Sequence, residues 1–273
     1  MKGELLRRLF EGDPEERRIA AEDLVEYGDE ETIRALFRAM VTDKNRGVKE
    51  ACAESLKQIG GELVMREAAN LLNGPDPLAR ALCLEILASF GEKAIPLLMP
   101  LLKSPDYNDR KYALDALALI GGKRAMDLIL GMTGDPEPNV KYTAVEYLSP
   151  MPPDSKITEA LKGLLEGAED EYGISTICQV VRSRREKELL PVLLKKVKGV
   201  EDPFIKHWLY KAIVVLDGEE HIKEALENAL RIDAVEDVLK DIILAKGEIP
   251  EGVKSFIRDK GIKVKDQLLE EAL

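Results

Sequence analysis

The feature that most constrains this chain is a helix-start signal that recurs at intervals of 30 to 33 residues. Each copy begins with an acid or an asparagine, whose side-chain oxygen can accept hydrogen bonds from the free N–H groups of a helix's first turn. In four copies a proline follows, at a position where its missing N–H has no cost. The starts are Asp13, Asn45, Asp76, Asp106, Glu137, Asp170, Asp202 and Asp233. A period of this length predicts a stack of repeated helical units.

Two columns of small or apolar residues follow the starts at fixed offsets. The column seven residues after the start contains Ala20, Cys52, Cys83, Ala113, Ala144, Ile177 and Leu209. The column eleven residues after the start contains Leu24, Leu56, Leu87, Leu117, Leu148, Val181, Ile213 and Leu244. Residues four apart share one face of a helix, so both columns predict core side chains.

Glycines fifteen residues after the first four starts predict a left-handed residue that ends the helix. They are Gly28, Gly60, Gly91 and Gly121. A second helix with apolar residues at helical spacing is then expected in each repeat, as in Ile33, Leu36, Phe37 and Met40. Pro96 and Pro100 are expected to kink the second helix of the third repeat.

The stretches 13–28, 76–91 and 106–121 resemble the short HEAT-like repeats of the phycobilin-lyase type, and the resemblance covers nearly the whole chain. It implies an all-α fold, a right-handed α-solenoid of about seven to eight HEAT-like helix pairs. We expect one solenoid over residues 1–273, with a capping helix over 1–12, repeats over 13–247 and a C-terminal cap over 248–273. Such repeats serve many roles, so the resemblance bears on fold more than on function.

Composition narrows the functional classes. A net charge of -11 argues against a protein whose whole surface coats nucleic acid or an anionic membrane. No apolar run approaches the roughly 20 residues that span a bilayer, and the first ten residues lack a signal-peptide pattern, so we expect a soluble cytoplasmic protein. Charged residues make up 33% of the chain while glutamine and asparagine are scarce, which favours a thermophilic source.

Most catalytic constellations are missing from the sequence. HEAT-repeat enzymes of the deoxyhypusine hydroxylase family hold two irons through His-Glu dyads, whereas neither His207 nor His221 is followed by a glutamate. No Ser, His and Asp set and no phosphate-binding loop stands out. We therefore expect no metal, no cofactor and no catalytic residue, although the resemblance leaves a lyase-like activity open.

Reactive or aromatic single residues have structural interpretations. HEAT-like DNA glycosylases use tryptophans beside an acid, but the single tryptophan here, Trp208, shares a helix position with Ile19 and Leu82 and is expected in the core. The three cysteines are expected to be buried structural thiols, since two lie in the small-residue column and the third lies next to it. They are Cys52, Cys83 and Cys178.

A basic column four residues after the starts is expected to form ion-pair ladders between adjacent repeats, as the resemblance implies. Its members are Arg17, Lys49, Arg80, Arg110, Lys141 and Lys206. Acids follow at Glu22, Glu54, Glu85, Asp115 and Glu146.

The resemblance also implies that the second helices line a concave face. Aligning them gives two outward columns: Arg34, Arg66, Pro96, Met126, Thr158, Pro191 and Lys223, and Arg38, Asn70, Pro100, Leu130, Lys162, Lys195 and Glu227. Six of these residues are basic and one is acidic, against the net charge of the whole chain. An apolar centre between basic ends is typical of a protein interface.

We therefore predict a non-catalytic scaffold that binds proteins in a concave groove. The predicted binding residues are Arg34, Arg38, Arg66, Asn70, Pro96, Pro100, Met126, Leu130, Lys162, Lys195 and Lys223. The expected partner is a peptide or helix with an apolar centre and acidic flanks. Two alternatives stay open: nucleic-acid binding along the basic strip, and a bilin-lyase-like enzyme acting on a small molecule.

Overall fold

A computed structural model describes residues 1–217 and 220–273, and in this part of the chain every regular element is a helix. The predicted all-α solenoid is confirmed. The chain divides into two compact units, residues 1–143 and 144–273. None of the described helices is long and apolar enough to cross a membrane.

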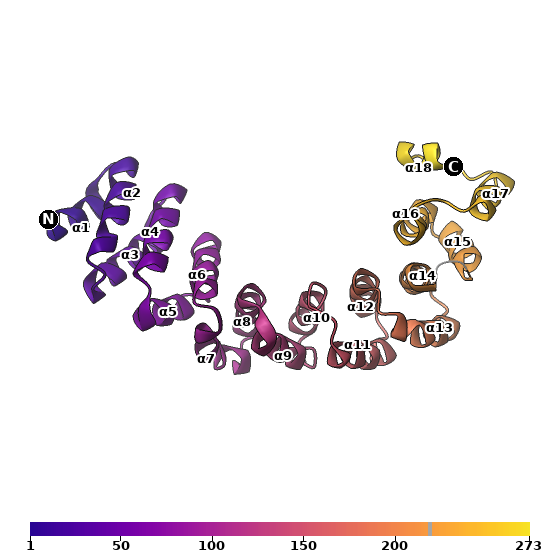
Figure 1. Ribbon diagram of the computed structural model, residues 1–273, viewed down its shortest axis with the longest axis horizontal. Coiled ribbons are helices and arrows are strands. Elements are labelled where there is room, and N and C mark those ends of the chain that lie inside the picture. The colour runs from indigo at the N-terminus through magenta and orange to yellow at the C-terminus, as the bar shows by residue number, and fades with distance from the viewer. Residues whose placement is uncertain (218–219) are drawn as a thin grey trace. The chain divides into compact units, whose positions relative to one another are not determined.

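Unit 1 begins with α1 (Lys2–Glu11) and continues with alternating first and second helices (Figure 1). We call first helices those that begin within two residues of a predicted start. In unit 1 these include α2 (Pro14–Asp23), α4 (Arg46–Ile59), α6 (Pro77–Ser89) and α8 (Tyr107–Ile120). The second helices are α3 (Glu30–Thr42), α5 (Gly61–Asn70), α7 (Ile95–Leu98) and α9 (Gly122–Met132). Helix α10 (Pro138–Tyr147) contains the boundary between the units.

Unit 2 repeats the same alternation. Its first helices are α12 (Glu171–Arg184), α14 (Pro203–Asp217) and α16 (Val235–Lys246). Its second helices are α11 (Ser155–Gly167), α13 (Leu190–Gly199), α15 (Ile222–Leu230) and α17 (Glu251–Asp259), and α18 (Gln267–Ala272) ends the chain.

The predicted caps start most of the first helices. Asp13 forms a capping box with Glu16, and the side chains of Asn45 and Asp170 each accept a backbone N–H of the first turn. The last start is wrong: Asp233 has a left-handed φ of 54°, and α16 begins at Val235 instead.

The predicted core columns are buried in seven of the eight repeats. Leu56, Leu117 and Ile213 have no exposed surface, and the other members behave alike. The exception is Leu244, which is 53% exposed. Because α16 starts later than predicted, Val238 and Ile242 face the core, and Leu244 lies on the opposite side of the helix.

Glycine and proline act at the repeat turns as predicted. Gly60 and Gly121 end α4 and α8 with φ values of 67° and 66°, a left-handed conformation that a side chain would strain. In the third repeat, prolines interrupt the second helix, so that only the short α7 between two 3-10 turns is α-helical. Pro100 has no N–H to donate four residues back, to Pro96, so the α-helix cannot continue.

The two helix rows differ in how closely they pack. Figure 1 shows that within each unit, taken by itself, the first helices lie on the inner side of the curve and the second helices on the outer side. Small side chains such as Ala20 and Cys52 let the first helices approach closely. The expectation that second helices line the concave face is therefore wrong.

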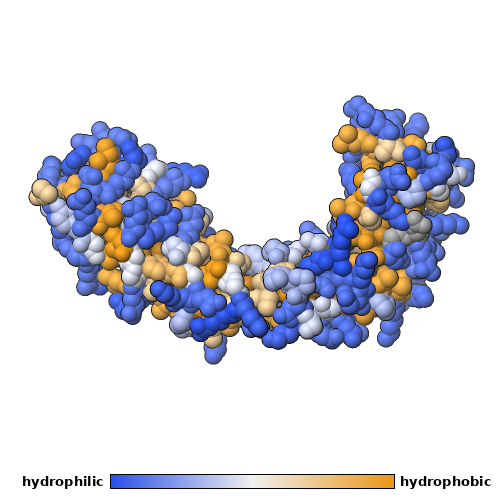
Figure 2. Space-filling view, viewed as in Figure 1, coloured by the Kyte–Doolittle hydropathy of each residue, from blue (hydrophilic) through white to orange (hydrophobic). Residues whose placement is uncertain are grey.

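Figure 2 shows polar residues over much of the visible surface of each unit, interrupted by smaller apolar areas.

Partly buried ion pairs connect adjacent repeats of unit 1. Arg17 of α2 donates from Nε to Asp43 Oδ2 at 2.7 Å and from Nη1 to the Gly12 carbonyl at 2.7 Å. Asp43 lies in the loop before α4 and accepts the Asn45 N–H, so one carboxylate ties α2 to the start of the next first helix. Lys49 pairs in the same way with Asp76.

The same motif recurs two repeats further on. Arg110 of α8 makes a two-point contact with Asp135, from Nε at 2.8 Å and from Nη2 at 2.9 Å, and it donates to the Ser104 carbonyl. Asp135 also accepts the Glu137 N–H. The predicted ladder is thus present at three members of the basic column. Its acids are not those of the predicted acidic column, since Glu22 pairs instead with Arg18 on its own helix.

The pKa of each of the three ladder aspartates is held below its usual value. Burial alone would raise the pKa of Asp135, but hydrogen bonds from Arg110 and from the Glu137 N–H outweigh it and hold the pKa below its usual value. The native state therefore binds fewer protons than the unfolded chain near the usual aspartate pKa. The stabilisation is present at neutral pH and is lost as pH falls through that range toward the lower native pKa.

We predict that Asp135→Ala lowers the free energy of unfolding by about 3 kcal/mol, because Arg110 is left buried without its counterion. Urea denaturation followed by circular dichroism measures the change. Glu50→Ala is the matched control, since it removes an exposed partner of Arg46 and should cost about 0 to 1 kcal/mol. Equal losses in the two variants would contradict a stabilising ladder.

Candidate interaction surfaces

Four of the predicted binding residues lie on two contacting helices of unit 1. Arg34 and Arg38 of α3 and Arg66 and Asn70 of α5 are all exposed, and the two helices contact each other. The guanidinium of Arg38 lies 4.9 Å from the ring centroid of exposed Phe10 on α1, a cation–π contact that sequence reasoning missed. We call Phe10, Arg34, Arg38 and Arg66 the basic patch.

The predicted apolar centre is only partly exposed. Pro96 and Pro100 are exposed at the two ends of α7, and Leu130 is half-buried. Met126 is 7% exposed and packs with the core together with Ala125. Its assignment to the outward face is wrong, because α9 begins at Gly122 and turns Met126 inward.

In unit 2 the predicted lysines lie on three different second helices. Lys162 on α11 is half-buried, and Lys195 on α13 and Lys223 on α15 are exposed. Their predicted role in one groove with the basic patch stays a prediction.

The predictions for the three cysteines and for the tryptophan have different outcomes. Burial raises the pKa of all three cysteine thiols to about 12, which agrees with their expected place in the core: Cys52, Cys83 and Cys178. Trp208 is only half-buried, so its expected core position is wrong. Its Nε1 donates to Glu171 Oε1 on α12 at 3.3 Å, and Lys211 Nζ lies 5.5 Å from its ring centroid.

A charge cluster that sequence reasoning missed connects the three first helices of unit 2. Arg182 of α12 pairs with Asp241 of α16 at 2.5 Å, and Lys211 Nζ of α14 lies 3.5 Å from Asp241 Oδ2. Buried His207 of α14 and Lys211 both approach exposed Asp237, at 3.7 and 3.8 Å. The sequence does contain one sign of this cluster, since Asp241 is an acid that stands between core residues of α16.

The cluster shifts two pKa values in opposite directions. Burial raises the pKa of Asp241, against the pull of Arg182 and Lys211. Burial, assisted by Lys211, lowers the pKa of His207. Arg182 Nε and His207 Nδ1 are buried without a hydrogen-bond partner among the described residues. The arrangement can tie three helices together and hold a neutral imidazole. Within the described residues, no group of three or more His, Cys, Asp or Glu is placed to hold a metal ion.

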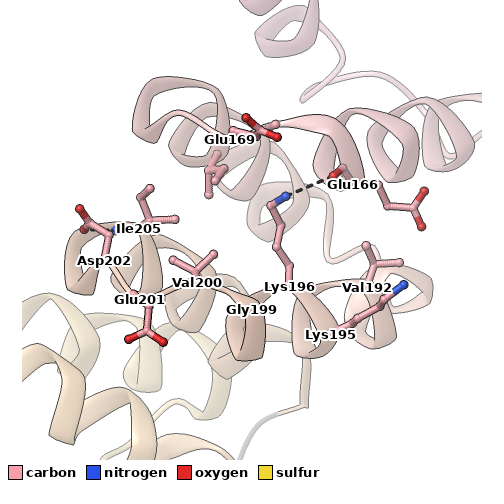
Figure 3. Close-up of a pocket in the computed structure, with 12 residues that line it drawn as sticks. Glu166, Glu169, Val192, Lys195, Lys196, Gly199, Val200, Glu201, Asp202 and Ile205 are labelled. Atoms are coloured by element: carbon pink, nitrogen blue, oxygen red, sulfur yellow. Dashed lines mark hydrogen bonds between the residues drawn. The ribbon is translucent and has the colours of Figure 1, made fainter.

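A pocket of about 760 Å³ opens between the α11–α12 and α13–α14 connections of unit 2 (Figure 3). Its apolar lining comes from Ala168, Ile174, Val192, Val200 and Ile205. The charged residues around it are Glu166, Glu169, Lys195, Lys196, Glu201 and Asp202. Figure 3 shows Lys196 extended across the pocket, where its Nζ donates to the Glu166 carbonyl at 3.3 Å.

We predict that mild acid destabilises the cluster through His207. The pKa of His207 is lowered in the native state. Below the usual histidine pKa the unfolded chain therefore binds more protons than the native state, and the free energy of unfolding decreases as pH drops from 7 to 5. Thermal unfolding at both pH values should show a smaller loss for His207→Gln than for the wild type. The same loss in both proteins would exclude His207 as the responsible group.

Several solved structures are similar to this chain over most of their length. The Escherichia coli protein YibA is 18% identical, with 88% of this chain and 91% of that chain covered and a TM-score of 0.47. Human deoxyhypusine hydroxylase in complex with glycerol is 14% identical over 88% and 95%, with a TM-score of 0.35. The CpcE–CpcF complex of phycocyanin lyase from Nostoc sp. is 18% identical over 86% and 94%, with a TM-score of 0.34.

Family membership rests on the sequence profile of HEAT repeats. No curated protein matches the sequence. The HEAT-repeat profile matches residues 4–69, 65–149 and 95–174, which together span more than half of the chain. The buried columns and the repeating first helices of unit 1 are the structural counterpart of that match, which ends at residue 174. This chain therefore belongs to the HEAT-repeat family.

Proposed function

We propose that this chain is a non-catalytic scaffold that binds an acidic segment of a partner protein on the basic patch of unit 1. The observation that carries the proposal is the contact of Arg38 with Phe10, with exposed Arg34 one turn earlier on α3 and exposed Arg66 on the contacting helix α5. Arginine and aromatic side chains supply much of the binding energy at protein interfaces. In a chain with a net charge of -11, such a patch selects its partner by charge.

The arginines of the patch differ in how free they are to bind. Arg34 Nη2 lies 2.8 Å from Glu30 on its own helix. In contrast, Arg38 and Arg66 have no carboxylate within 4.0 Å among the described residues. An incoming carboxylate therefore displaces no existing ion pair at these two positions, and the planar guanidinium can donate two parallel hydrogen bonds to its oxygens.

The expected partner chemistry follows from these contacts. Acidic residues of the partner would pair with Arg38 and Arg66, which belong to only one of the two predicted basic ends. The predicted apolar centre has to be revised, because Met126 is buried. We assign the apolar contact with the partner to Phe10, and to Pro96 and Pro100 beyond the patch. Phycocyanin lyase and deoxyhypusine hydroxylase show that HEAT-like proteins include enzymes, and the non-catalytic role is part of the proposal.

Fluorescence anisotropy with a labelled peptide tests the patch. The probe is a peptide in which glutamates flank a leucine–phenylalanine pair. Arg38→Glu with Arg66→Glu should weaken its binding by at least about tenfold, or about 1.4 kcal/mol, because two attractive contacts become repulsive. The matched control is Arg124→Glu with Arg231→Glu, which changes the net charge equally at two other exposed positions.

Two outcomes would contradict the proposal. Equal weakening by the control pair would mean that net charge, and not the patch, attracts the peptide. Salt-sensitive binding of mixed-sequence DNA that is lost in the Arg38→Glu, Arg66→Glu variant would assign the patch to nucleic acid instead.

A further inference from the structure

Unit 2 exposes aromatic side chains at equivalent places in consecutive repeats. Tyr172 and Phe204 both occupy the second position of a first helix, α12 and α14, and are 50% and 52% exposed. Half-buried Trp208 reaches from α14 to Glu171 on α12. Aromatic residues make up only 5% of the chain, so three of them on two adjacent helices mark an unusual surface. Exposed aromatics of this kind are enriched at protein interfaces.

The pocket of Figure 3 lies directly beside these first turns. Ile205, which lines it, follows Phe204, and Glu169 precedes Tyr172 by three residues. Its apolar lining comes from both the α11–α12 and the α13–α14 connections and from helices α12, α13 and α14. A volume of about 760 Å³ is large enough to receive apolar side chains of a partner.

Charge at this place is opposite to that of the basic patch. Residues 166–171 and 199–204 contain six acids and no basic residue. Two lysines of α13 also line the pocket, and one of them, Lys196, already donates to the Glu166 carbonyl. The rings are suited to cations, as the contact of Lys211 with Trp208 at 5.5 Å illustrates.

We infer that this pocket, together with Tyr172, Phe204 and Trp208, is a second docking surface that binds a basic segment of a partner protein carrying at least one apolar side chain. The apolar side chain enters the pocket, and lysines or arginines of the segment contact the acidic rim and the rings. The inference is independent of the basic patch.

The single tryptophan supplies a direct assay. We expect a synthetic peptide of alternating lysine and leucine to change Trp208 emission saturably, and a glutamate–leucine peptide of the same length to leave it unchanged. A lysine–serine peptide should bind at least about fivefold more weakly, since it offers nothing to the pocket. Equal binding of the lysine–serine peptide, or no binding of the lysine–leucine peptide, would overturn the inference.

Two sets of variants locate the contact. Glu169→Lys with Glu201→Lys should weaken binding at least about tenfold, and Phe204→Ala about fivefold or more. The control Glu26→Lys with Glu62→Lys makes the same change of net charge in unit 1, at exposed positions, and should stay within about twofold. An equal effect of the control pair, or wild-type affinity in Phe204→Ala, would overturn the inference. Arg38→Glu with Arg66→Glu should not weaken this binding, which separates the result from that for the basic patch.

Discussion

Everything else in this molecule depends on apolar helix faces that no helix pair can cover alone. Leu56 and Leu117 have no exposed surface because a neighbouring repeat covers them, and the same holds along the column. Stability in such a chain is a sum of contacts between nearest neighbours. The ion pairs of Arg17 and Arg110 strengthen this arrangement, since each ties one first helix to the N-terminal turn of the next.

Stacking also determines which side chains are available for binding. The faces between repeats are committed to the core, so partners can meet only the outward sides of the two helix rows and the connections between them. The basic patch combines Phe10 of α1 with arginines on second helices of unit 1, and the pocket of Figure 3 lies at helix connections of unit 2. The arginines of the patch and the charged residues around the pocket lie outside the core, so they can differ without loss of packing.

Much of the fold could be predicted from the sequence because caps and core columns are local and periodic. Asp13 and Asn45 cap as expected, since a cap depends only on the next few residues. The register of α16 could not be read, because aspartate can cap a helix in an extended conformation or adopt a left-handed φ, and Asp233 does the latter. Met126 was misplaced by the same kind of uncertainty, since a small error in a helix start moves a side chain from surface to core.

Binding features were harder to predict than packing because they combine residues from different repeats. The sequence placed Arg34, Arg38 and Arg66 correctly at the surface, but Phe10 joins them from α1, outside the aligned columns. The cluster around Asp241 and the pocket beside Phe204 each draw on separate helices. Spacing within one helix carries no information on such contacts.

The central claim is that one chain joins two partners of opposite charge through separate surfaces. Native mass spectrometry of the protein with both the glutamate-flanked and the lysine–leucine peptide tests it most directly, after the two peptides have been shown not to pair with each other. The account predicts a ternary species containing one copy of each peptide, with each bound as tightly as when it is alone. Mutually exclusive binding, with only binary complexes at saturating concentrations, would contradict it.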